Sequence, residues 1–62
     1  MSQTPLNLLT REGAVAVVFE PALEPEHYSR LYDIVRDVET ETELKLVVKA
    51  VAAEWGRTVY FD

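Results

Sequence analysis

The sequence predicts a small α+β domain in which an αα-hairpin of two antiparallel helices packs on one face of a small, mostly antiparallel sheet. Three observations support this fold class. Residues 25–38 and 41–55 carry apolar side chains at helical spacing, and only a short link separates the two segments. Residues 14–19 and 57–61 are rich in β-branched and aromatic residues, which are typical of strands. The expected element order is ββααβ, with residues 1–62 forming a single domain.

The N-terminal segment has two interpretations. Leu6–Thr10 forms a strand if Gly13 supplies the positive φ angle of a three-residue hairpin loop. The same segment forms one or two helical turns if Thr4 is the N-cap, Pro5 is the first helical residue and Gly13 lies past the end. The hairpin is the favoured interpretation. The alternative order, αβααβ, would leave a two-stranded sheet, which needs a partner to be stable.

The two strands that flank the helices differ in pattern. Residues 14–19 read AVAVVF and end before a Glu-Pro pair, where proline cannot continue a hydrogen-bonded ladder. Their nearly continuous hydrophobicity predicts that one face is covered and the other is at least half covered. Residues 57–61 alternate instead, which places Val59 and Phe61 on one face and Tyr60 on the other.

The first helix is expected to begin at Pro25, because proline is favoured at the first helical position, where its missing N–H is not needed. Its apolar stripe consists of Tyr28, Leu31, Tyr32, Val35 and Val38. Asp33 and Asp37 lie on the opposite, solvated side. The helix should therefore bury one face and carry acids on the other.

The second helix has the clearest boundaries. Thr40 and Glu43 have the spacing of a capping box, in which each side chain bonds the backbone N–H of the other residue. Gly56 stands where a left-handed residue would end the helix. The buried face recurs at spacings of three and four residues and comprises Leu44, Val47, Val48, Val51, Ala52 and Trp55.

Composition narrows the range of functions. The chain has 62 residues, a formal net charge of −5 and no cysteine, so disulfides and thiolate metal sites are excluded. An acidic surface repels nucleic-acid phosphates and anionic membranes, so neither direct nucleic-acid binding nor membrane binding is expected. The longest apolar stretch is too short to span a bilayer. The first residues lack the basic start and long apolar run of a secretory signal, so the expected location is the cytoplasm.

The chain offers little catalytic chemistry. His27 is followed by Ser29, but residues two apart on a helix face different sides and cannot form a nucleophile–base pair. We expect His27 to be a surface residue in the first helical turn. No phosphate-binding loop, metal pair or nucleophile elbow is present. The sequence therefore predicts a protein without catalytic residues, cofactor or metal, and not an enzyme.

A cluster of acidic residues where the first helix ends and the second begins is the candidate functional surface. Between Asp37 and Glu43 a carboxylate occupies every second position, and no basic residue lies among them. The capping box and the helix dipole account for Glu41 and Glu43, whereas Asp37 and Glu39 fall near a helix C-terminus, where acids are mildly unfavourable. The predicted partner-binding surface, which we call the acidic corner, comprises Asp33, Asp37, Glu39, Glu41 and Glu43.

These features predict a non-enzymatic acidic module that binds a protein with a basic surface. Small acidic proteins of this kind, typically encoded by phages or mobile elements, mimic the charge of nucleic acid. They inhibit nucleic-acid-binding partners such as CRISPR or restriction components. The alternative is a self-associating structural or accessory domain, in which the partner is a second copy and the chain forms a homodimer. Charge-driven capture weakens with ionic strength whereas apolar self-association does not, so salt dependence separates the two.

Overall fold

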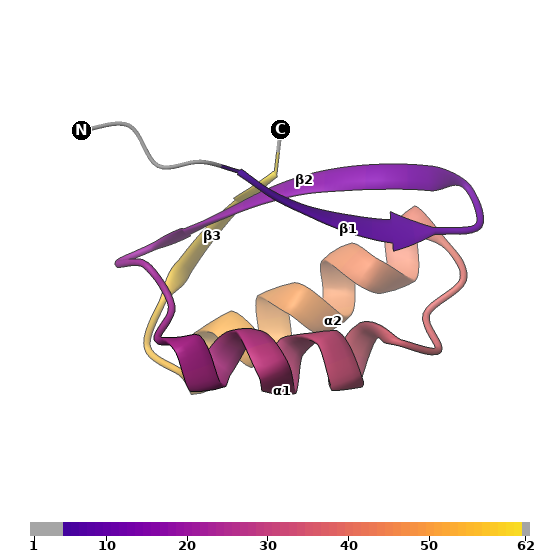
Figure 1. The fold of residues 1–62 in the computed structure, drawn as a ribbon. Coiled ribbons are helices and arrows are strands. Elements are labelled where there is room, and N and C mark those ends of the chain that lie inside the picture. The colour runs from indigo at the N-terminus through magenta and orange to yellow at the C-terminus, as the bar shows by residue number, and fades with distance from the viewer. Residues whose placement is uncertain (1–4, 62) are drawn as a thin grey trace.

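The computed structural model describes residues 5–61 and confirms the α+β class with the order ββααβ. Both helices lie on the same face of a three-stranded sheet and run in opposite directions (Figure 1). The elements are β1 (Leu6–Thr10), β2 (Gly13–Glu20), α1 (Pro25–Val35), α2 (Glu41–Glu54) and β3 (Thr58–Phe61).

The sheet has the order β1-β2-β3, with β2 antiparallel to both neighbours. The hairpin interpretation of the N-terminal segment is therefore confirmed; Thr4, the N-cap of the alternative, lies outside the described residues. The loop is shorter than expected, because Thr10 pairs directly with Gly13 and only Arg11 and Glu12 form the turn. Gly13 has a φ angle of +129°, a conformation that side-chain-bearing residues rarely adopt.

The core lies between the sheet and the two helices. Val48 and Val51 are buried as predicted, which confirms the assigned face of α2. Leu31 and Leu44 have no exposed surface, so each helix places a leucine at the centre of the interface. Within residues 5–61 the buried apolar residues are Leu8, Val15, Val17, Phe19, Leu23, Leu31, Val35, Leu44, Val48, Val51 and Ala52.

The opposite face of the sheet is not covered by any element of residues 5–61 (Figure 1). Ala14 is exposed and Val18 is half-buried, so the apolar run of β2 reflects partial cover by neighbouring strands and not a second layer. Leu9 is 79% exposed and Tyr60 is 53% exposed on this face. The fold is thus a two-layer structure with one open, largely apolar face.

The first helix ends earlier than the sequence predicts. The apolar stripe indicates a helix to residue 38, but α1 ends at Val35 and Arg36 is its C-cap. The Val38 N–H then donates to the Val35 carbonyl, and the half-buried Val38 packs against the core from a turn. A residue can thus contribute to the core after the helix has ended, which the helical periodicity alone does not reveal. Tyr32, expected in the apolar stripe, is half exposed.

Candidate functional site

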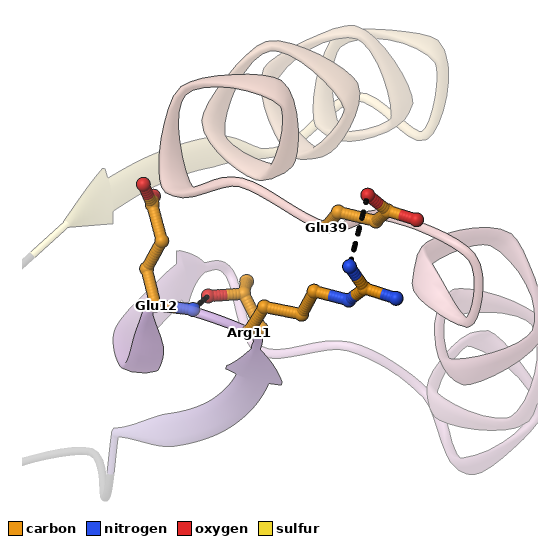
Figure 2. Close-up of polar contacts among 4 residues, drawn as sticks. Arg11, Glu12 and Glu39 are labelled. Carbon is orange, nitrogen blue, oxygen red and sulfur yellow. Dashed lines mark hydrogen bonds and ion pairs between the residues drawn. The ribbon is translucent and has the colours of Figure 1, made fainter.

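The β1–β2 hairpin loop contacts the segment that joins the two helices (Figure 2). The backbone N–H of Arg11 donates to the Glu39 carbonyl at 3.2 Å. The Arg11 guanidinium also lies 3.8 Å from the Glu39 carboxylate, and both side chains are largely exposed. Two loops that are distant in the sequence are thereby joined at one end of the molecule, which we call the corner end.

The start of α2 is held by acceptors from two different parts of the chain. Thr40 Oγ1 accepts a hydrogen bond from the Glu43 N–H at 3.2 Å, which confirms Thr40 as the N-cap. Glu12 Oε1, from the hairpin loop, accepts from the Glu41 N–H at 2.8 Å. The Glu12 side chain extends toward the start of α2 in Figure 2. One half of the predicted capping box is therefore present, and a carboxylate from the hairpin satisfies a second free N–H.

All five residues of the acidic corner are exposed. Asp33 lies on α1, and the α1–α2 connection carries Asp37 and Glu39. Glu41 and Glu43 belong to the first turn of α2, where acids interact favourably with the helix dipole. The sequence correctly places these residues where one helix ends and the next begins.

The acidic corner is less uniform than its spacing suggests. Residues two apart on an α-helix are rotated by roughly 200°, so Glu41 and Glu43 point to different sides. Within residues 5–61 the only ion pair is that of Arg11 and Glu39. Glu39 thus has a basic neighbour that explains its position, whereas Asp33 and Asp37 have no ion-pair partner among the described residues.

An open groove of about 460 Å³ lies at the corner end, between the hairpin loop and the α1–α2 connection. Two arginines and two acids share it, so its charges are mixed. Its lining residues are Leu9, Thr10, Arg11, Arg36, Asp37, Val38 and Glu39. The described residues contain no group of three or more His, Cys, Asp or Glu side chains placed to hold a metal ion. The groove is suited to contact with charged groups of a partner.

His27 and Trp55 form a second cluster at the opposite end of the molecule. Their rings stack with centroids 4.6 Å apart, and His27 Nδ1 accepts a hydrogen bond from the Glu24 N–H at 3.2 Å. His27 lies in the first turn of α1, as predicted, and is half-buried because its ring stacks on Trp55. The sequence contains a signal for the hydrogen bond to Glu24. His27 is the third residue of α1, and a side chain at that position can reach back to the backbone of the N-cap residue. His27 therefore helps to cap the N-terminus of α1, and Trp55 holds its ring in place.

Comparison with known protein families, curated proteins and solved structures finds no match to this chain. No helix within residues 5–61 has the length and apolar run needed to cross a membrane. The functional argument therefore rests on the residues of the corner end themselves.

Proposed function

We propose that this protein is a non-enzymatic acidic module that binds a basic surface on a partner protein through its acidic corner. The observation that carries the proposal is the exposure of Asp33 and Asp37 without an ion-pair partner in residues 5–61. Among the described residues, neither carboxylate accepts a hydrogen bond or caps a helix. Their negative charge is therefore available to a second molecule.

The position of these carboxylates favours recognition of a protein. Asp33 lies in the last turn of α1 and Asp37 lies two residues past its end, where it lines the groove together with Arg11 and Glu39. A rigid display of like charges attracts a complementary surface over distance and accelerates association. The net charge of −5 adds to this attraction for a basic partner and opposes binding to phosphates. A basic surface that binds nucleic acid is the partner chemistry that fits, which makes an inhibitor of such proteins the specific form of the proposal.

The experiment compares two double variants that change the net charge equally. Asp33→Lys with Asp37→Lys reverses the unpaired acids of the acidic corner. Glu20→Lys with Glu54→Lys reverses two exposed acids that end β2 and α2 at the opposite end of the molecule. Each substitution adds two charges, so both variants change the net charge from −5 to −1 (−5 + 4). Circular dichroism and thermal melts first establish that both variants are folded.

The three immobilised proteins are then used to capture partners from the cytosol of the organism that encodes the chain. Bound proteins are identified at low salt and again at about 0.3 M salt, where the Debye length falls below about 8 Å. We expect the wild type and the Glu20→Lys/Glu54→Lys variant to capture the same basic protein at low salt. The Asp33→Lys/Asp37→Lys variant should lose it. Equal capture by all three folded proteins would contradict the proposal.

A further inference from the structure

The outer edge of β1 is open for pairing. No strand in residues 5–61 lies on the side of β1 away from β2. The strand Leu6–Thr10 reads LNLLT and has no charged residue. Natural proteins usually protect such an edge with lysine, proline or a bulge, because an uncharged edge can pair with another strand. The other edge of the sheet, β3, is also uncharged but has four residues against the five of β1, so β1 offers the longer edge for an added strand.

The hairpin register determines which backbone groups face outward. In an antiparallel hairpin with a two-residue turn, the residues that flank the turn form a hydrogen-bonded pair, and the pairs then alternate. Thr10 and Leu8 therefore bond β2, whereas Asn7 and Leu9 direct their N–H and C=O groups away from it. Pro5 has no N–H, and the Arg11 N–H is occupied by the Glu39 carbonyl. The free edge thus consists of two residues placed symmetrically about Leu8.

An apolar groove accompanies this edge. It has a volume of about 220 Å³ and lies between β1 and α1. Tyr32, half exposed on α1, is a large apolar side chain beside the groove, and Leu9 carries its exposed side chain on the open face at the same edge. The groove is lined by Asn7, Leu8, Leu9, Tyr32, Val35 and Arg36. Backbone groups and apolar side chains are therefore available together at the same edge.

We propose that a second copy of this chain binds here, with β1 antiparallel to its own counterpart across a two-fold axis at Leu8. In this register Asn7 of each copy lies opposite Leu9 of the other, and about four ladder hydrogen bonds satisfy the outward backbone groups. The two sheets join into one sheet of six strands, three from each copy. The symmetric placement of Asn7 and Leu9 about Leu8 makes the edge complementary to itself, as an isologous dimer requires.

The net charge of −5 does not prevent a second copy from binding at this edge. The antiparallel arrangement places the two hairpin loops, and with them the two acidic corners, at opposite ends of the dimer. At a rise of about 3.4 Å per residue, Arg11 of one copy is roughly 20 Å from Arg11 of the other. That separation exceeds the Debye length of about 8 Å at physiological salt, so repulsion between the corners is screened. The dimer uses β1 and does not depend on the function proposed for the acidic corner.

Sedimentation equilibrium on the full chain tests the dimer. We expect a mass of twice the 7.1 kDa of one chain at about 200 µM, a concentration well above a micromolar dissociation constant. Asn7→Lys with Leu9→Lys places like charges opposite each other in both pairs and should raise the dissociation constant about tenfold or more. This variant is less negative than the wild type, so a weaker dimer cannot result from net repulsion. Asn7→Lys with Leu9→Glu places opposite charges in the same pairs and should restore the dimer.

A control variant separates this edge from the other surfaces of the sheet. Thr58→Lys with Tyr60→Lys adds the same charge to β3, on the open face, and should leave the dimer intact. Dissociation of this control would overturn the proposal, because it would place the interface on β3 or on the open face. A monomeric wild type at about 200 µM, or no difference between the Leu9→Lys and Leu9→Glu double variants, would also overturn it.

Discussion

The two ends of the molecule each begin a helix, and they do so by different means. At the corner end, two oxygen acceptors bond the first N–H groups of α2: Thr40 Oγ1 from the N-cap and Glu12 Oε1 from the hairpin loop. At the opposite end, the start of α1 is held by His27, which accepts a hydrogen bond from the Glu24 N–H and stacks on Trp55. One end is thus held by hydrogen bonds to oxygen acceptors, whereas the other adds an aromatic stack to its hydrogen bond.

The difference indicates which residues are available for function. Exposed polar and charged contacts contribute little to stability, and salt screens their charge interactions, whereas burial of an aromatic ring contributes more and is insensitive to salt. The surface of the corner end can therefore change without unfolding the protein, provided that Glu12 and Thr40 remain. The His27–Trp55 cluster is structural, since both residues contact the neighbouring elements that define the fold.

The largest effect on stability is expected at the end that carries the His27–Trp55 cluster. Trp55→Ala should lower the free energy of unfolding by about 3 kcal/mol, because it removes both packing on the core and the ring on which His27 stacks. Urea denaturation measures the change, and Trp55→Phe serves as a control that retains an aromatic ring and should lose less. If Trp55→Ala were as stable as the wild type, the two ends would not differ in the way described.

At the corner end, Glu12→Ala should lower the free energy of unfolding by about 1–1.5 kcal/mol, because the Glu41 N–H loses its charged acceptor. Glu12→Gln retains an acceptor oxygen and should lose roughly half of this. The loss should decrease as salt is added, unlike that of Trp55→Ala. A salt-independent loss would indicate that Glu12 acts through packing and not through its charge.

Thr40→Ala should lower the free energy of unfolding by about 1 kcal/mol, the usual loss when an N-cap hydroxyl is removed. Thr40→Ser retains the acceptor and should be close to wild type in a thermal melt. Since Thr40 and Glu12 bond N–H groups in the same first turn of α2, the loss of stability in the double alanine variant should differ from the sum of the two single losses, which a double-mutant cycle measures. An unchanged melting temperature in Thr40→Ala would mean that α2 begins elsewhere.

The smallest of the single changes concerns Arg11. Arg11→Ala should alter the free energy of unfolding by less than about 0.5 kcal/mol, because its ion pair with Glu39 is exposed and 3.8 Å long. Its backbone hydrogen bond to the Glu39 carbonyl is retained in the variant. Urea denaturation at low and high salt tests this expectation. A loss above 1 kcal/mol would show that the guanidinium is needed to hold the two loops together.

Local patterns in the sequence predict much of the fold. The spacing of Thr40 and Glu43, the apolar repeat that follows and Gly56 define α2 almost to the residue, and Gly56 has the expected positive φ angle of +69°. Each of these features depends on neighbours within one or two helical turns. The face of β3 that carries Val59 and Phe61 follows equally from alternation, and both residues pack on the core.

The long-range contacts could not be predicted from such patterns. Glu12 and Glu41 are 29 residues apart, and only the fold brings the hairpin loop to the start of α2. The stack of His27 on Trp55 similarly requires that the start of α1 lies beside the end of α2. The acidic corner was predicted as a set of residues, but its division into Glu39, which faces Arg11, and the unpaired Asp33 and Asp37 required the structure.

The central claim is that Asp33 and Asp37 serve no structural purpose, and the stability of the Asp33→Lys/Asp37→Lys variant tests it most directly. We predict a free energy of unfolding in urea that equals the wild-type value within about 0.5 kcal/mol or exceeds it slightly. Both acids lie at or just beyond the C-terminal turn of α1, where positive charge is favoured. A loss of more than about 1 kcal/mol would contradict the claim, because it would make these carboxylates part of what holds the fold together.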